Sequence, residues 1–289
     1  MGDQNKILVS IVIPCYNHGQ FIQETLDSIQ KDNADDFYEI IIVNDGSTDK
    51  ATIDKLQQFE ANGYQVINQS NKGLSAARNA GIEKAKGKYI LPLDSDNMIH
   101  PDYYRKAIKI FESDQSVGVA YSDCEIFDSK NEISAVGEFD LEKILTGNYI
   151  DACALFRIEC WKEVGGYDST IPHRVYEDWD LWLSISSTRW KFHYIPEPLF
   201  KYRELEVSLK TAALNEDNRR DTIGYIVNKH QEIYNLHYAK VISKLHGIIA
   251  HWEQNFNNEV LHVKALLQNQ ENEIKEFYHT PNSITTNKK

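Results

Sequence analysis

The first two hundred residues alternate short apolar runs with segments of helical spacing. The apolar runs lie at residues 7–13, 39–43, 64–67 and 89–93. Continuous runs rich in Val and Ile are typical of strands buried on both faces of a parallel sheet. Helices are predicted between these strands, including one over about 50–60 and one over 74–86 that ends at Gly87. Strands that alternate with helices predict an α/β domain with helices on the faces of its sheet.

The pattern changes after residue 115. Short strands are expected over 117–121, 124–127 and 152–156, and the chain becomes polar and helical from about residue 204. Residues 259–277 have apolar positions at helical spacing and predict an amphipathic helix, a coiled-coil stub. The last ten residues are polar and are expected to be disordered. We therefore expect an α/β domain over 1–204 and a helical C-terminal extension over 205–289.

Charge and cysteine usage narrow the function classes. The chain has 31 Lys and Arg against 43 Asp and Glu, a formal net charge of −12, and this argues against a nucleic-acid partner. Its four cysteines form neither a zinc-binding pattern nor a disulfide framework, which favours a reducing compartment. The apolar run at 7–13 is too short to span a membrane. We expect a cytoplasmic protein, either free or peripherally attached to the inner face of the membrane.

Polar clusters follow three of the predicted strands. They are Pro14–Asn17, Asn44–Asp49 and Asp94–Asn97. Ligands of open α/β sheets bind beyond the carboxyl ends of the strands, so these clusters are expected to converge. Together they supply an aromatic ring, hydrogen-bond acceptors and paired carboxylates, which suits a nucleotide with a metal ion. Taken alone, the 44–49 segment is also a good turn and helix cap for any α/β protein.

The pair Asp94 and Asp96 is the sharpest of these signals. Alternating carboxylates after a strand can face one hard cation, and Mg²⁺ and Mn²⁺ prefer such oxygen ligands together with phosphate oxygens. Without a cation the two carboxylates repel each other. The pair therefore predicts a divalent metal site, although this short pattern also occurs by chance.

The segment 71–79 resembles an anion-binding helix start. Gly73 allows close approach of the backbone, and the N-terminus of a helix favours an anion. Arg78 falls one turn into this helix, where it can reach a phosphate or a bound sugar. The alternative is a surface arginine on an alanine-rich helix.

The segment 175–182 places three acids around two tryptophans. Acids are expected in the first turn of any helix because of the helix dipole. The functional interpretation is a general base, Asp178 or its neighbour Glu177, beside aromatic platforms for a sugar ring.

Six segments of the chain resemble one known family. They read VSIVIPCYN (9–17), IIVNDGSTD (41–49), NKGLSAARNAGI (71–82), YILPLDSDN (89–97), GGYD (165–168) and EDWDLW (177–182). In this order and spacing they are similar to the inverting glycosyltransferases of family 2, which have the GT-A fold. The resemblance covers about residues 7–200. It implies a Rossmann-like, mainly parallel mixed sheet flanked by helices, and transfer of a sugar from a nucleotide sugar to an acceptor hydroxyl.

The resemblance also implies residue roles. Pro14 and Tyr16 contact the nucleobase, and Asp45 accepts a hydrogen bond from it. Asn71 and Arg78 line the nucleotide and the diphosphate. Asn17, Ser47, Gly73 and Ser95 belong to the nucleotide-sugar site, Asp94 contacts the ribose or sugar, and Asp96 with Asp94 binds Mn²⁺ or Mg²⁺. Asp178 is the base, Glu177 orients either the acceptor or Asp178, and Trp179 and His173 contact the acceptor.

The family default is a UDP-sugar donor that carries a hexose or an N-acetylhexosamine. The acceptor is then a glycan or lipid-linked glycan in bacterial surface polysaccharide or glycoconjugate synthesis. The extension over 205–289 shapes the acceptor site, forms a homodimer or lies on a membrane.

Two rival functions remain open. A sugar nucleotidyltransferase usually has a basic, glycine-rich loop where this chain reads PCYNHGQF. A non-catalytic GT-A-fold scaffold would not need the acids that this chain retains. A dinucleotide-dependent dehydrogenase is disfavoured, because no GxGxxG motif follows a strand.

Overall fold

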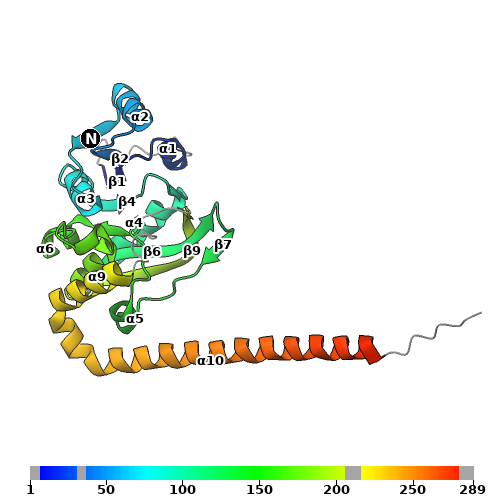
Figure 1. The fold of residues 1–289 in the computed structure, drawn as a ribbon. Coiled ribbons are helices and arrows are strands. Elements are labelled where there is room, and N and C mark those ends of the chain that lie inside the picture. Colours follow the sequence, from blue (N-terminus) through cyan, green and yellow to red (C-terminus); the bar gives the residue numbers. More distant parts are fainter. Residues whose placement is uncertain (1–6, 31–36, 206–215, 280–289) are drawn as a thin grey trace, which may run out of the picture. The chain divides into compact units, whose positions relative to one another are not determined.

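The computed structural model describes residues 7–30, 37–205 and 216–279, and it gives side-chain surroundings in the last helix as far as Leu261 and at Lys264 (Figure 1). The chain divides into two compact units, Met1–His237 and Tyr238–Lys289. The first unit holds the sheet, and the second is described as helix up to His279.

A nine-stranded mixed sheet forms the centre of the first unit. Its strands are β1 (Val9–Cys15), β2 (Tyr38–Asp45), β3 (Gln65–Gln69), β4 (Tyr89–Pro92), β5 (Met98–Ile99), β6 (Val117–Phe127), β7 (Glu132–Ser134), β8 (Leu155–Arg157) and β9 (Lys191–Arg203). They are ordered β3-β2-β1-β4-β8-β6-β9-β5, and β7 pairs with β6. The first four strands are parallel, whereas β8 runs antiparallel to both β4 and β6. The fold is the mixed α/β architecture that the sequence predicts.

Helices connect the strands. They are α1 (Ile22–Gln30), α2 (Lys50–Ala61), α3 (Leu74–Ile82), α4 (Asp102–Ser113), α5 (Leu141–Thr146), α6 (Ile158–Val164), the 3₁₀ turn η1 (Pro172–Arg174), α7 (Glu177–Ser186), α9 (Glu216–Lys229) and α10 (Gln231–His279). Helices α3 and α7 begin where the strand ends gather, so they carry residues toward the site described below.

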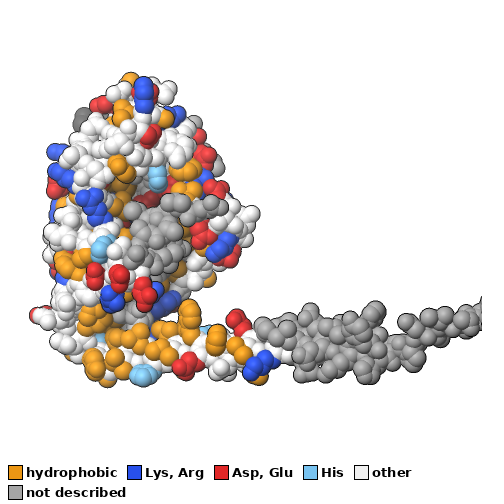
Figure 2. Space-filling view, viewed as in Figure 1, with side chains coloured by type: hydrophobic (Ala, Val, Ile, Leu, Met, Phe, Trp, Pro, Cys, Tyr) orange, Lys and Arg blue, Asp and Glu red, His pale blue; other side chains and the backbone are white. Residues whose placement is uncertain are grey.

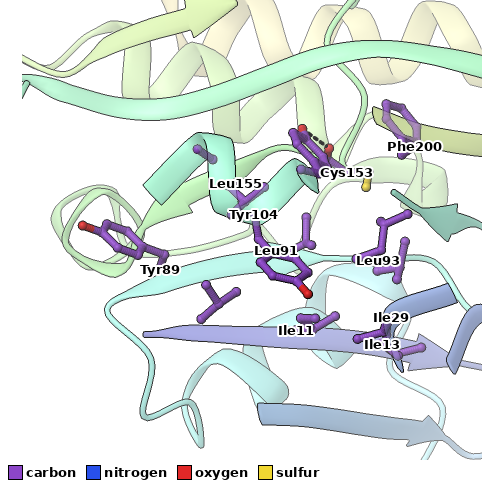
Figure 3. Close-up of a cluster of buried hydrophobic side chains, with 14 of the residues drawn as sticks. Ile11, Ile13, Ile29, Tyr89, Leu91, Leu93, Tyr104, Cys153, Leu155 and Phe200 are labelled. Carbon is purple, nitrogen blue, oxygen red and sulfur yellow. Dashed lines mark hydrogen bonds between the residues drawn. The ribbon is translucent and has the colours of Figure 1, made fainter. Parts of the chain in front are cut away.

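The hydrophobic core explains why the parallel strands are continuous apolar runs. All seven residues of β1 are buried, because helices cover both faces of the sheet. Figure 3 shows Ile11 and Ile13 of β1 packed with Leu91 and Leu93 of the neighbouring chain segment and with Tyr104 from α4. This packing holds the ends of β1 and β4 in register, and the polar loops that follow them start from fixed positions.

Most of the predicted elements are confirmed, with three differences. The strand predicted over 152–156 is limited to β8, Leu155–Arg157. The predicted strands 117–121 and 124–127 form one continuous strand, β6. The chain does not turn at Ser122 and Asp123, because the pairing with β9 continues there with a shift of register. The helix predicted over 74–86 ends at Ile82. Beyond it, the backbone N–H groups of Lys86 and Gly87 donate to side chains of β2 and β1 and not to the preceding helical turn.

The first compact unit extends beyond residue 204, where we predicted a boundary. Helix α9 packs on η1, and its Thr222 hydroxyl donates to the Pro172 carbonyl, while Tyr225 donates to Asp168. The predicted amphipathic segment 259–277 lies within α10, and most of its side chains lie outside the described residues. The last ten residues, predicted to be disordered, also lie outside them. None of the helices in the described ranges is long and apolar enough to cross a membrane.

Candidate functional site

A cavity of about 480 Å³ lies at the carboxyl ends of β1, β2 and β4. It is lined by Pro14, Cys15, Tyr16, His18, Asp45, Asn71, Gly73, Leu74, Ala77, Asp94, Ser95, Asp96, Arg174, Tyr202, Arg203 and Leu205. The three predicted polar clusters therefore do converge, because parallel strands end at one edge of the sheet. The volume falls within the range of small-molecule sites, about 300–1,000 Å³.

Asp45 holds one wall of the cavity in place. Its buried carboxylate accepts hydrogen bonds from the backbone N–H groups of Lys72 at 2.9 Å and Gly73 at 2.8 Å, and from the Gln69 side chain at 2.7 Å. These bonds tie the start of α3 to the end of β2. A contact from Asp45 to a nucleobase stays a prediction.

Asn17 and Ser47 form the outer support of the same wall. The Asn17 side-chain oxygen accepts from the backbone N–H groups of Thr48 and Asp49, and the Asn17 backbone N–H donates to Ser47. They therefore join the loops after β1 and β2, and neither is among the lining residues. Tyr16, by contrast, lines the cavity with an exposed ring.

The two carboxylates that follow β4 also line the cavity. The side chains of Asp94 and Asp96 are 32% and 16% exposed. Burial, and after it the charge of Asp94, raises the pKa of Asp96 to about 7. Between them, the Ser95 backbone carbonyl accepts a hydrogen bond from Thr25 of α1, which anchors the loop.

This donor set fits a divalent cation. Two oxygen ligands beside a cavity match the way Mg²⁺ is commonly bound, through one or two carboxylates plus substrate phosphates. The carboxylates of Asp94 and Asp96 repel each other, and a bound cation would offset this repulsion. Groups of three or more His, Cys, Asp or Glu side chains suited to a metal do not occur among the described residues.

Arg78 is neither at the surface nor among the lining residues of the cavity. Its side chain is 1% exposed, with one nitrogen 2.7 Å from Asp94 Oδ1 and the other 2.5 Å from Glu177 Oε1. Its guanidinium also lies over the Tyr167 ring. This placement excludes the surface arginine of the alternative interpretation, because Arg78 joins the acids after β4 to the acids at the start of α7. A contact from Arg78 to a phosphate or sugar stays a prediction.

Asp178 lies in the first turn of α7 in a setting that favours its neutral form. Its Oδ2 accepts a hydrogen bond from the Asn148 side chain at 2.8 Å, and its Oδ1 accepts from the backbone N–H of Trp179. Burial, and then the charges of Glu177 and Asp151, raise the pKa of Asp178 to about 8. A carboxylate with a pKa near the working pH is suited to general-base catalysis.

The loop before α7 is held in an unusual backbone conformation. His173, Arg174 and Tyr176 all have positive φ, at 58°, 55° and 64°, a region that non-glycine residues rarely occupy. Arg174 donates to the Asn71 side-chain oxygen at 2.7 Å, and a Cβ on Gly73 would stand 2.8 Å from Arg174 Cδ. Gly73 thus gives room to this side chain, which reaches the cavity from outside the predicted motifs.

The two residues predicted to contact the acceptor are not among the lining residues of the cavity. Trp179 is 3% exposed, and its indole N–H donates to the Ile144 carbonyl at 2.7 Å, so its ring packs in the interior and presents no face to a sugar. His173 lies 3.6 Å from Asp221 of α9 and does not line the cavity. Trp179 therefore faces the interior, whereas His173 is exposed beside α9. Acceptor contacts from these two residues stay predictions.

Sequence reasoning missed several residues at the site. Arg203, at the end of β9, donates to the Asp96 carbonyl at 3.0 Å and pairs with Glu24 and Asp128, so it supports the loop that follows β4. Asp151 is a further acid near Asp94, and burial followed by that charge raises its pKa to about 6. These residues come from distant segments without a recognisable motif, and only the topology brings them together.

Two solved structures share the architecture of this chain. The structure resembles Staphylococcus aureus TarS 1–349 in complex with UDP-GlcNAc, with a TM-score of 0.61, 16% identity, and coverage of 80% of this chain and 73% of the other. It also resembles the mannosyltransferase PcManGT from Pyrobaculum calidifontis in complex with GDP-Man and Mn²⁺, with a TM-score of 0.59, 16% identity, and coverage of 79% and 65%. The fold is therefore the GT-A fold.

Sequence comparison places the chain within a family. The profile of glycosyl transferase family 2 matches residues 10–165, and the chain belongs to this family. It is 30% identical over 240 residues to the chondroitin synthase of Pasteurella multocida (strain Pm70) and 29% identical over 236 residues to the hyaluronan synthase of Pasteurella multocida. These matches cover 80% and 78% of this chain, which spans about a quarter (24%) of the length of each relative.

Replacement of Arg78 tests whether it links the two acidic motifs. Arg78→Met leaves Asp94 and Glu177 without their shared cation, and breaking a buried pair costs about 3–5 kcal/mol of the free energy of unfolding. As a control, Lys50→Met breaks an exposed ion pair with Asp54 and is expected to change the free energy of unfolding by less than about 1 kcal/mol. Urea unfolding measures both. Equal small losses in the two variants would contradict the central role of Arg78.

Proposed function

We propose that this enzyme transfers a hexose or an N-acetylhexosamine from a UDP-sugar to a hydroxyl of a glycan acceptor, with inversion at the anomeric carbon. The observation that carries the proposal is the cavity lined by the Tyr16 ring, Asp45 and the pair Asp94 and Asp96. An aromatic ring, a hydrogen-bond acceptor and two carboxylates are the groups that a base, a sugar and a diphosphate with a cation require. Support also comes from the solved TarS complex, which contains UDP-GlcNAc.

The nucleotide end of the donor lies, in this proposal, between Tyr16 and the wall built by Asp45. Tyr16 directly follows Cys15, the last residue of β1, and its exposed ring offers a face for stacking of the base. Asn71 lies across the same cavity beside Arg174. The donor sugar then points toward Asp94 and the start of α7.

The diphosphate end requires positive charge. Asp96, with Asp94, would hold Mn²⁺ or Mg²⁺, and such an ion neutralises charge on the departing diphosphate. Arg174 is an exposed guanidinium at the cavity wall, whereas Arg78 is already committed to Asp94 and Glu177. We therefore assign to Arg174 the phosphate contact that the sequence assigned to Arg78.

Asp178 would act as the base. The acceptor oxygen forms a bond to the anomeric carbon from the face opposite the diphosphate, and its proton moves to Asp178. The bond from that carbon to the diphosphate oxygen breaks, and its electron pair leaves with the nucleoside diphosphate. Glu177 would act indirectly, because its carboxylate is bound to Arg78 and adds to the charge that raises the Asp178 pKa.

The acceptor in this proposal is a growing glycan, free or lipid-linked, in bacterial surface polysaccharide or glycoconjugate synthesis. The names of the relatives, chondroitin synthase and hyaluronan synthase, support a glycan-building role. Cytoplasmic synthesis, with or without peripheral contact to the inner face of the membrane, belongs to the same proposal.

Donor turnover tests the assignment of nucleotide and metal. We expect release of UDP from one UDP-sugar in a panel of nucleotide sugars with an added glycan acceptor, dependent on Mn²⁺ or Mg²⁺ and abolished by chelator. Asp96→Ala should lose at least 10²-fold in rate, on the order of a removed electrostatic group in an active site. Asp54→Ala, at an exposed acid of α2, should retain full activity. Chelator-resistant turnover, or turnover with a different nucleotide, would overturn this part of the proposal.

Asn148 provides a test of Asp178 as the base. A base must be deprotonated to act, so kcat/KM should rise with pH and level off above the Asp178 pKa of about 8. The Asn148 amide donates to the Asp178 carboxylate and favours its charged form. Asn148→Leu should therefore move the midpoint of the rise in kcat/KM to higher pH. Asp178→Asn should abolish this rise with pH and lower the rate about 10²–10⁴-fold. If Asn148→Leu lowered kcat/KM by the same factor at every pH, Asp178 would not be the base.

Arg174→Gln tests the proposed phosphate contact. A charge-assisted hydrogen bond contributes about 1.5–3 kcal/mol, so we expect KM for the nucleotide sugar to rise about 10- to 100-fold. Arg219→Gln, on the exposed surface of α9, removes the same charge and should leave KM unchanged. Calorimetry with the nucleoside diphosphate provides the binding measurement, and equal affinity of wild type and Arg174→Gln would refute the contact.

A further inference from the structure

Helix α10 carries a row of exposed apolar side chains in the second compact unit. Tyr238, Ile242, Ile249, Trp252 and Phe256 are 65%, 37%, 54%, 73% and 66% exposed. With Leu245, which is partly buried, they succeed one another at steps of four, three, four, three and four residues. We call these six residues the α10 seam. Figure 2 shows hydrophobic side chains gathered along this helix.

The spacing of the α10 seam indicates the kind of partner that covers it. Alternating steps of three and four residues make the heptad repeat of a coiled coil, in which each apolar side chain fits between side chains of a facing helix. A helix on a flat lipid or protein surface generally has a wider apolar stripe than such a single row. Three large aromatic rings exposed in one row are also unusual on a water-facing surface. The seam is therefore suited to another helix with the same repeat.

Charge and area favour a second copy of this chain as that partner. The α10 seam itself has no charged residue, so two copies can face each other without repulsion between like charges. The whole helix contains four Lys and six Glu, a net negative balance that disfavours an anionic lipid surface. A standard interface buries about 800 Å² per partner. Three rings of about 150–250 Å² each, two-thirds exposed here, supply roughly half of this area, and the aliphatic residues add to it.

We propose that the enzyme is a homodimer in which the α10 seam of one copy packs against the α10 seam of the other. The heptad spacing and the uncharged seam carry this inference independently of the donor, the acceptor and the base. The active-site cavity is lined by residues of the first unit only, so dimerisation and donor turnover are separable properties.

The mass of the full-length chain in solution tests the proposal. The monomer has a mass of 33.4 kDa, and light scattering at micromolar concentration should give twice this value. Trp252→Glu and Ile249→Glu each place a charge in the α10 seam and should halve the measured mass. Gln254→Glu adds the same charge on the opposite side of the helix and should stay dimeric.

Two controls keep the outcome clear. Circular dichroism and donor turnover should be unchanged in the seam variants, which separates loss of the dimer from loss of the fold. A monomeric wild type, or seam variants as dimeric as Gln254→Glu, would overturn the proposal. Binding of monomeric wild type to vesicles of anionic phospholipid, lost in Trp252→Glu, would also overturn it and identify the seam as a membrane surface.

Discussion

The geometry of the site depends on one buried arginine side chain. Arg78 is almost fully enclosed and holds Asp94 on one side and Glu177 on the other. These acids belong to the loop after β4 and to the start of α7, which are far apart in the sequence and are joined here by charge-assisted hydrogen bonds. Because an unpaired buried charge is very costly, the two acidic motifs and the helix that carries Arg78 must be assembled together. The loop that follows β4 and the proposed base at the start of α7 therefore have a fixed relation.

A second constraint acts at the wall of the cavity. Asp45 binds the backbone at Gly73, and Gly73 leaves room for Arg174 beside Asn71. The chain around Arg174 adopts left-handed backbone conformations that cost energy, and such strain is common where function requires a particular geometry. The strain and the glycine together bring a guanidinium to the cavity, and this is the physical basis for assigning it to the diphosphate.

The cavity and the α10 seam belong to different compact units of the chain. The charges that surround the donor site are all carried by the first unit, whereas the α10 seam is an apolar surface of the second. The large curated relatives extend well beyond the matched region, since this chain spans about a quarter of their length.

Strand positions, the fold class and the convergence of the polar clusters were predictable from sequence. Buried parallel strands have continuous apolar runs, and their carboxyl ends must meet at one edge, so 7–13, 39–43 and 89–93 already located Tyr16, Asp45 and Asp96 at one site. The partners of each side chain were not predictable. Arg78 was expected at a phosphate, Trp179 at a sugar, and Arg203 and Asp151 were not expected at all. Local pattern specifies which residues a strand or helix contains, but contacts between distant segments depend on how the elements pack, and only the tertiary structure decides these.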